Sequence, residues 1–225
     1  MRGGGALTPD QTKVSEELKA LFPAHLNSPG LRKADGTVLT LDAKGEGTFK
    51  EYVKSFVIAS AQKALKAGKD LSGLTWMTVK DGTVADIDFG KFAAYATRIK
   101  TPPAFDSLEL RSPENNLFGT ATVDSQHFTA FSKDHSADHS LADASLVKMM
   151  NPTDYIGTQG TAMAPYWRIR HGTVDRDTSL AVPVILTTKL LNHGNKVDFA
   201  MPWGQGHGGD YDLDELFAWI NQICR

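Results

Sequence analysis

The stretch YWRIRHGTVDRDTSLAVPVILTTKLLNHGNKVDFAMPW, residues 166–203, decides the fold class. Residues 166–170 are typical of a strand, residues 180–193 of an amphipathic helix, and residues 197–203 of a second strand. A strand, a helix of this length and a strand form a right-handed βαβ unit, whose two strands pair in parallel. We therefore expect an α/β fold, with a sheet that is buried on both faces.

A final helix follows the second strand, yet residues 161–225 are too few to complete a sheet. The apolar positions of this helix are Leu213, Leu216, Phe217, Trp219 and Ile220. The preceding residues lack the alternating strands and helices that would supply more parallel strands. We expect residues 161–225 to form the edge of a sheet whose other strands lie elsewhere.

Residues 1–160 are expected to form a separate region, mainly helical, with short hairpins and a loop-rich end. Apolar spacing, caps and turn residues predict three helices, at residues 8–23, 48–67 and 88–99. The same signals predict a short strand or hairpin arm at residues 35–41, a hairpin at residues 74–87, and a loop-rich region from residue 103 to residue 160. The chain is thus predicted to have two domains, divided at residue 160.

Composition narrows the class of partner. The chain is 41% hydrophobic and 22% charged, with a net charge of −2 and a pI of about 6.4, so no broad basic surface would attract nucleic acid or anionic lipid. The single cysteine, Cys224, forms no disulfide within the chain. Residues 1–5 carry no apolar signal-peptide segment, so we expect a soluble protein and find no support for export.

Asp175 and His207 are the candidate acid and base. Asp175 follows the first predicted strand of the βαβ unit and His207 follows the second. The carboxyl ends of parallel strands meet at one sheet edge, where ligands and acid–base groups gather in α/β proteins. Each residue alone is more typical of an ordinary turn, but the paired placement favours an Asp–His pair that takes a proton from a nucleophile.

The nucleophile is the missing component. A serine hydrolase of the α/β type carries its serine in a GxSxG elbow, and these 225 residues contain none. Ser60, within an apolar-rich helix, and Ser112, just before a proline, lack the flanking glycines of such an elbow. His135 and His139 have a spacing that suits a metal, but their polar surroundings favour a solvated loop. We expect no metal site and no cofactor.

Several segments resemble bacterial tannases, which are α/β-hydrolase esterases with a large lid domain. The C-terminal matches are residues 166–172, 175–180 and 202–216, and the upstream matches, similar to the lid, are residues 22–24, 47–55, 100–106 and 112–119. The resemblance extends over nearly the whole chain. It implies a lid at residues 1–160 and the C-terminal part of the hydrolase core at residues 161–225.

The resemblance also implies roles for individual residues. Asp175 would be the acid and His207 the base of a catalytic triad, while Lys100, Glu114 and Asp177 would bind the phenolic hydroxyls of a galloyl group. Adjacent ring hydroxyls both donate and accept hydrogen bonds, which two carboxylates and an ammonium can satisfy. Without the resemblance, Lys100 and Glu114 would be interpreted as a surface ion pair.

The N-terminal half of the family, with its nucleophile elbow, has no counterpart in these residues. We therefore expect the lid and acid–base portion of a serine carboxylic ester hydrolase, acting on galloyl or related phenolic esters and inactive alone. The gene or its sequence would be truncated, or a second polypeptide would supply the other half; the exposed sheet edge would otherwise self-associate. The alternative is a non-catalytic module that binds a phenolic ligand or a partner protein.

Overall fold

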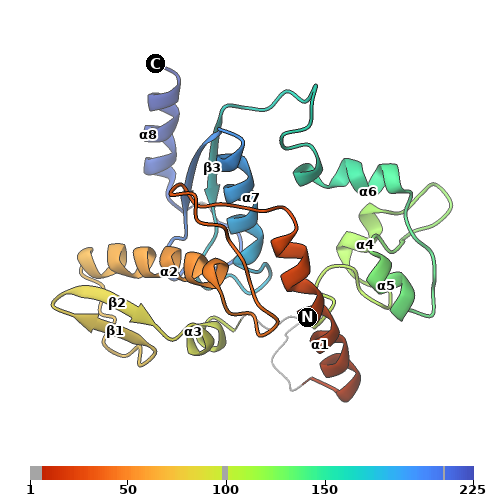
Figure 1. Cartoon of the computed structure of the whole chain (residues 1–225), viewed down its shortest axis with the longest axis horizontal. Helices are drawn as coiled ribbons and strands as arrows, with labels where there is room; N and C mark the ends of the chain where they lie inside the picture. The colour runs from red at the N-terminus through yellow and green to blue at the C-terminus, as the bar shows by residue number, and fades with distance from the viewer. Residues whose placement is uncertain (1–6, 98–100, 210) are drawn as a thin grey trace. The chain divides into compact units, whose positions relative to one another are not determined.

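The computed structural model describes residues 7–97, 101–209 and 211–225. The chain forms two compact units: unit 1 contains residues 1–25 and 100–161, and unit 2 contains residues 26–99 and 162–225. The architecture is mixed, with helices and small sheets (Figure 1). Residues 26–99, which the sequence predicts to lie outside the C-terminal part, pack with it in unit 2.

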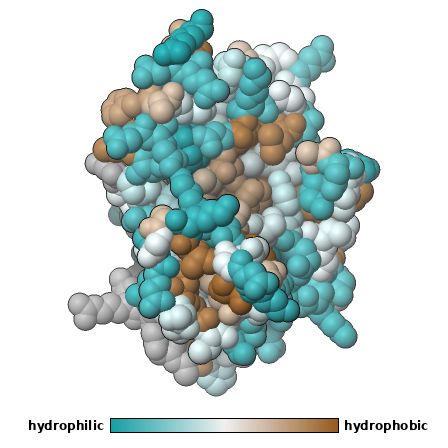
Figure 2. All heavy atoms as spheres, turned by 90° about the vertical axis from the view of Figure 1, so that its left-hand side faces the viewer, coloured by the Kyte–Doolittle hydropathy of each residue, from teal (hydrophilic) through white to brown (hydrophobic). Residues whose placement is uncertain are grey.

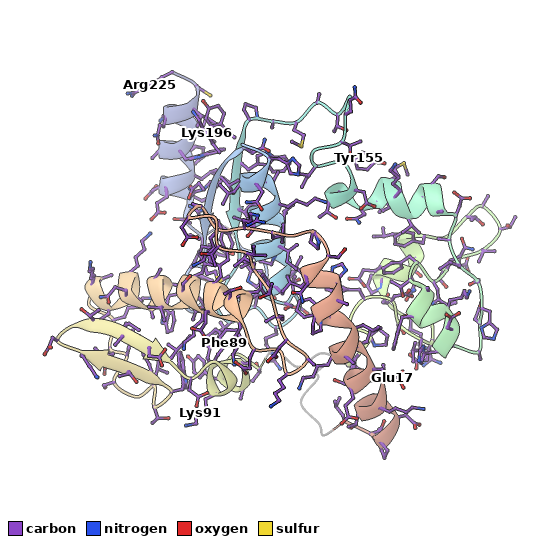
Figure 3. All side chains as sticks on the ribbon, in the orientation of Figure 1. Glu17, Phe89, Lys91, Tyr155, Lys196 and Arg225 are labelled. Carbon is purple, nitrogen blue, oxygen red and sulfur yellow. The ribbon has the colours of Figure 1, made fainter. Side chains whose placement is uncertain are left out.

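The predicted βαβ unit is present in unit 2. Strands β3 (Tyr166–Arg170) and β4 (Lys196–Ala200) pair in parallel, with Tyr166 opposite Lys196 and Arg170 opposite Ala200. Helix α7 (Ala181–Asn192) joins them and packs against both strands. Within the described residues this sheet has two strands. At the start of β4, Lys196, labelled in Figure 3, places its Nζ 5.1 Å from the centre of the Tyr166 ring.

Helix α2 (Thr48–Lys66) supplies much of the core of unit 2, as its apolar stripe predicts. It buries Phe49, Val53, Val57, Ala61 and Ala64. The helix ends where Gly68 adopts a φ of 81°, with the Gly68 and Lys69 amides donating to the carbonyls of Leu65 and Ala64. This is the glycine-dependent termination expected from the sequence. Phe56 contacts Phe199 of β4, with ring centres 4.8 Å apart.

The predicted hairpin is formed by β1 (Met77–Lys80) and β2 (Thr83–Ile87), which lie along α2 (Figure 1). Asp81 and Gly82 both have positive φ, as a tight two-residue hairpin turn requires. Helix α3 (Phe89–Tyr95) is capped by Asp88. The helix ends at Tyr95, earlier than the predicted residue 99, because Thr97 has a φ of 53° and leaves the helical conformation; residues 98 and 99 lie outside the described residues.

Residues 35–41, predicted as a short strand or hairpin arm, form no regular strand but do form a hairpin arm: the Leu39 amide donates to Leu31 O at 2.8 Å and the Lys33 amide to Thr37 O at 2.9 Å. The segment makes one isolated bridge, between Arg32 and Val38. Further along, side chains take the place of a partner strand: the Thr40 amide donates to Thr48 Oγ1 at 2.8 Å and the Leu41 amide to Asn27 Oδ1 at 2.9 Å. The turn and the β-branched alternation therefore predict a hairpin arm, whose pairing is limited to this bridge and its two flanking hydrogen bonds.

Helix α1 (Pro9–Asn27) begins as predicted, but it does not end at Pro23. The Gln11 amide donates to Thr8 Oγ1 and the Thr8 amide to Gln11 Oε1, forming a reciprocal cap. Pro23 has no amide hydrogen, so it removes one helical hydrogen bond. The helix nevertheless continues, with Leu26 1% exposed and Asn27 bonded to both the amide and the carbonyl of Leu41.

Unit 1 is organised around the buried carboxylate of Asp106. Asp106 Oδ2 accepts from the Phe128 amide and from the amide and hydroxyl of Thr129, while Oδ1 faces Asn115 Nδ2 and His127 Nδ1. Burial raises the pKa of Asp106, but the hydrogen bonds from Thr129, His127 and Asn115 outweigh it and hold the pKa below its usual value. The region predicted as loops also contains four short helical segments: α4 (Pro113–Leu117), α5 (Ala130–His135), α6 (Ala144–Met150) and η1 (Pro152–Asp154).

Helix α8 (Leu213–Ile223) has no fully buried residue among its members. Its apolar side chains Leu213, Phe217 and Ile220 are 43%, 60% and 37% exposed. Figure 2 faces the side of the molecule on which α2 and α8 lie and shows apolar surface there between polar side chains. Among the described helices, none combines the length and the apolar character needed to cross a membrane.

Candidate functional site

The candidate site lies on two loops that follow the parallel strands of unit 2. The loop after β3 comprises residues 171–178, and the loop after β4 comprises residues 201–212. The two loops are joined by hydrogen bonds from the Thr173 amide to Pro202 O at 3.1 Å and from the Val174 amide to Gln205 O at 3.0 Å. The Gly204 amide donates back to Thr173 Oγ1 at 2.8 Å. The two loops are therefore fixed to each other by hydrogen bonds that do not involve Asp175 or His207.

Gly172 sets how closely the loops approach. A Cβ atom built at this position would lie 2.1 Å from Gln205 O and 2.6 Å from Gly206 O. Both contacts are with backbone atoms, which cannot move without displacing the loop that carries His207. Glycine is therefore required at residue 172 by close approach of two backbones.

Asp175 and His207 form the pair that their placement after the strands predicts. His207 Nδ1 lies 3.0 Å from Asp175 Oδ2. The Asp175 side chain is 6% exposed, whereas that of His207 is 59% exposed. An Nδ1–H that donates to this carboxylate leaves the Nε2 lone pair of the exposed imidazole available to accept a proton.

The other oxygen of Asp175 holds the carboxylate in place. Oδ1 accepts hydrogen bonds from the amides of Asp177 at 2.8 Å and Thr178 at 3.1 Å. Burial raises the pKa of Asp175, but the Thr178 amide, His207 and the Asp177 amide together lower it below its usual value. The carboxylate is thus kept ionised and fixed in rotation, with Oδ2 facing His207.

Asp177 lies beside this pair, as the resemblance implies, on the exposed side of the same loop. One ligand-type atom from each of Asp175, Asp177 and His207 lies within 4.8 Å of the other two. Asp177 thus adds an exposed carboxylate beside the buried one of Asp175, whose Oδ2 already faces His207 Nδ1.

His171 is a second histidine at the site, and sequence reasoning missed it. Its Nε2 lies 3.4 Å from Asp175 Oδ2 and 3.1 Å from Thr178 O, and its Nδ1 lies 3.0 Å from Gly172 O. The side chain is 7% exposed. Its position at the carboxyl end of the first predicted strand, four residues before Asp175, was the available signal.

A cluster of two arginines and two aspartates, here called the arginine clamp, fixes the far end of the His207 loop. Arg168 and Arg170 both donate hydrogen bonds to the Asp198 side chain of β4. Asp212 Oδ2 accepts from Arg168 Nη2 and from Arg170 Nε, each at 2.7 Å. Asp212 has a φ of 69°, an uncommon conformation for a residue other than glycine. Burial lowers the pKa of Arg170, but its hydrogen bonds to Asp198 and Asp212 raise the pKa by more than burial lowers it. The guanidinium therefore stays charged. Sequence reasoning missed this clamp because it depends on strand register.

The remaining candidate residues are Glu114, Lys100, Ser60 and Ser112. Glu114 is half-buried in the first turn of α4, in unit 1, and Lys100 lies outside the described residues. The Ser60 hydroxyl donates to Met201 O. The Ser112 hydroxyl donates to Phe105 O and accepts from the Asn115 amide as the cap of α4. Both hydroxyls therefore have structural bonds.

The prediction of a loop at His135 is wrong, because this residue ends α5. His135 Nε2 lies 2.7 Å from Glu17 Oε2, and His139 Nδ1 lies 3.0 Å from Lys133 O. Within the part of the chain that the structure describes, these two histidines belong to no cluster of three metal-ligating groups.

Comparison with known proteins places the two loops in context. No protein-family model matches the chain, and no curated protein matches it. Solved structures do: a tannin acyl hydrolase from Lactobacillus plantarum is similar to it with a TM-score of 0.95 and 45% identity, over 98% of this chain and 48% of that one.

Two further structures give the same result. A tannin acyl hydrolase in complex with ethyl gallate matches with a TM-score of 0.94 and 45% identity, over 98% of this chain and 48% of that one. The tannase of Fusobacterium nucleatum matches with a TM-score of 0.92 and 47% identity, again over 98% of this chain and 48% of that one. The resemblance to tannases seen in the sequence is confirmed: the chain is similar to solved tannases at 45–47% identity, and it spans about half the length of those that it matches.

Proposed function

We propose that the chain is the acid–base portion of a tannase-like serine carboxylic ester hydrolase. In this proposal Asp175 is the acid and His207 the base of a catalytic triad. The observation that carries it is the 3.0 Å contact between His207 Nδ1 and Asp175 Oδ2, made by an exposed imidazole and a buried carboxylate. The contact joins residues that stand in the chain order of an α/β-hydrolase triad.

The chemistry follows from this geometry. His207 Nε2 takes the proton of a serine hydroxyl as its oxygen attacks the ester carbonyl, and Asp175 stabilises the imidazolium that forms. When the tetrahedral intermediate collapses, His207 gives the proton to the departing alcohol. Water then repeats the sequence on the acyl-enzyme and releases the acid. The 225 residues contain no GxSxG elbow, so in this proposal the serine and the oxyanion hole belong to a segment outside them.

The proposed substrate class is esters of gallic and related phenolic acids. One solved relative holds ethyl gallate, and Asp177 places a carboxylate beside the Asp175–His207 pair. Asp177, Glu114 and Lys100 are proposed to bind the ring hydroxyls, as the resemblance implies. We also propose that residues 161–225 are the C-terminal part of an α/β-hydrolase core and that residues 1–160 contain its lid.

A chimera tests the proposed function. The part of the L. plantarum enzyme that matches this chain is replaced by the chain, and hydrolysis of methyl gallate is measured. We expect the chimera to hydrolyse the ester, His207→Ala to abolish the reaction and His193→Ala, at an exposed position outside the site, to leave it unchanged. The chain alone is expected to be inactive.

A folded but inactive chimera would contradict this proposal and favour the alternative, a binding module without catalysis. Hydrolysis by the chain alone, lost in His207→Ala, would show that a nucleophile lies within the 225 residues. Binding of gallate is measured on the same proteins. A protein that binds gallate without hydrolysing the ester has lost the chemistry, whereas one that does not bind gallate has lost recognition.

A further inference from the structure

His171 is a buried titratable group that the proposed acid–base chemistry does not use. It extends the parallel pairing of β3 and β4 by one residue, since its amide donates to Ala200 O at 3.3 Å. Its side chain is 7% exposed and faces Asp175 rather than solvent. Burial excludes it from the general-base role, which the exposed imidazole of His207 fills.

The two ring nitrogens of His171 face carbonyl oxygens on opposite sides. Nδ1 lies 3.0 Å from Gly172 O, and Nε2 lies 3.1 Å from Thr178 O. A neutral imidazole has one N–H and one lone pair, so it donates to only one of these oxygens. The other nitrogen would then present a lone pair to a carbonyl in a buried site, which is unfavourable. An imidazolium, with two N–H groups, satisfies both contacts.

The charged surroundings favour the same protonation state. Asp175 Oδ2 lies 3.4 Å from His171 Nε2, and the carboxylate remains ionised because hydrogen bonds lower its pKa, with the charge of His171 adding to the effect. The other ionisable groups at these loops include His207, 3.0 Å from the same oxygen, and Tyr211, whose pKa is raised by burial and by Asp175. A cation at residue 171 therefore compensates a buried anion.

We propose that His171 is a positioning residue for the Asp175–His207 pair, held as a buried imidazolium that donates from Nδ1 to Gly172 O and from Nε2 to Thr178 O, and whose charge pairs with Asp175 Oδ2. Its ring contacts carbonyl oxygens near both ends of the loop of residues 171–178, those of Gly172 and Thr178. Backbone amides hold Oδ1 from one side, and His171 holds Oδ2 on the side away from solvent, so Oδ2 meets His207 in one orientation. The effect of His171 on catalysis rests on the proposed function, whereas the protonation state of its ring does not.

Two substitutions separate charge from hydrogen bonding. The amide of Gln at residue 171 reaches about as far as Nε2, so His171→Gln keeps an N–H donor beside Thr178 O and Asp175 Oδ2 without the charge. The amide of Asn reaches only as far as Nδ1, so His171→Asn loses that donor. His193→Gln and His193→Asn are matched controls at an exposed position of unit 2.

The test uses the full chain and nitrogen NMR of its histidine rings at pH 7. We expect two protonated nitrogens at His171, and an Nδ1–H at His207 that is protected from exchange by Asp175. His171→Asn is expected to lose the protection of the His207 Nδ1–H, His171→Gln to retain part of it, and the His193 variants to leave it unchanged. In the chimera, His171→Asn is expected to lower kcat roughly 10- to 100-fold, the scale of one charge-assisted hydrogen bond, with little change in KM.

Each outcome bears on the proposal. A single protonated nitrogen at His171 would overturn the cation, and full protection of the His207 Nδ1–H in folded His171→Asn would overturn the positioning role. If His171→Asn fails to fold, His171→Gln decides, because unchanged protection together with an unchanged kcat would contradict the role of the charge. A chimera that is inactive with His171 intact would instead count against the proposed function, leaving the ring measurements on the chain to judge this inference.

Discussion

Replacing Asp175 by Asn is the most informative perturbation, because the surroundings of the carboxylate dictate how the amide must sit. Two backbone amides, those of Asp177 and Thr178, donate to Oδ1. An Asn NH₂ group turned toward them would place donors against donors. Apart from His207, the described residues place one N–H group beside Oδ2, that of His171 Nε2, so two donors against one favour an Asn side chain that keeps its oxygen at the Oδ1 position and directs its NH₂ toward His207.

This orientation reverses the hydrogen bond to the base. In Asp175→Asn the amide donates to His207 Nδ1, so the imidazole must carry its proton on Nε2 and can no longer accept one there. Loss of the correct tautomer in a triad lowers kcat by about 10⁴-fold, which corresponds to about 5.5 kcal/mol of transition-state stabilisation. Substrate binding should change little, since Asp175 is buried behind His207.

The assay has two parts. Nitrogen NMR of the chain reports the tautomer of His207, and hydrolysis of methyl gallate by the chimera reports kcat and KM. Asp214→Asn, at an exposed residue of α8, is the matched control. A His207 ring that keeps its proton on Nδ1 in Asp175→Asn, or a kcat within tenfold of the unsubstituted chimera, would refute the reasoning.

Three further predictions concern close packing, acid stability and specificity. Gly172→Ala forces a Cβ within 2.1 Å of Gln205 O and is expected to lower the free energy of unfolding by about 1–3 kcal/mol; unchanged denaturant midpoints would contradict this. Because the pKa of Asp106 is held below its usual 3.8, its contribution to stability is complete above that value and is lost as the pH falls through the lowered pKa. Denaturant titrations from pH 6 downward should show this loss, and Asp106→Asn should reduce the pH dependence. In the chimera, Asp177→Ala, Glu114→Ala and Lys100→Ala should each reduce the preference for gallate over benzoate esters, measured as the ratio of kcat/KM values; equal losses on both substrates would argue against hydroxyl recognition.

Local signals in the sequence were sufficient for the elements that pack by simple periodicity. The apolar stripe of α2 and the turn residues of the β1–β2 hairpin predict their elements closely. The pairing of Asp175 with His207 was also predictable, since it follows from the rule that parallel strands end at one sheet edge. These predictions need only residues close together in the sequence or a general rule of topology.

Unit 1 was less predictable because its order depends on one carboxylate. Asp106 binds groups 9 to 23 residues away, at Asn115, His127, Phe128 and Thr129. Hydrogen bonds between a side chain and a distant backbone leave no periodic pattern, so the short helices around Asp106 resemble loops in the sequence. The continuation of α1 past Pro23 has a similar cause, in the tertiary bonds of Asn27.

The geometry of the candidate site depends on the register between β3 and β4, which no local pattern in the sequence specifies. Arg168 is paired with Asp198 across the sheet, and this register lets Arg168 and Arg170, two residues apart on one face of β3, hold Asp212 at the end of the His207 loop. A slip of one residue would turn both arginines to the other face and would move Gly172 away from Gln205, the contact that fixes the two loops. The arginine clamp and Gly172 therefore specify the same alignment from opposite ends of the His207 loop, and the Asp175–His207 distance follows from that alignment.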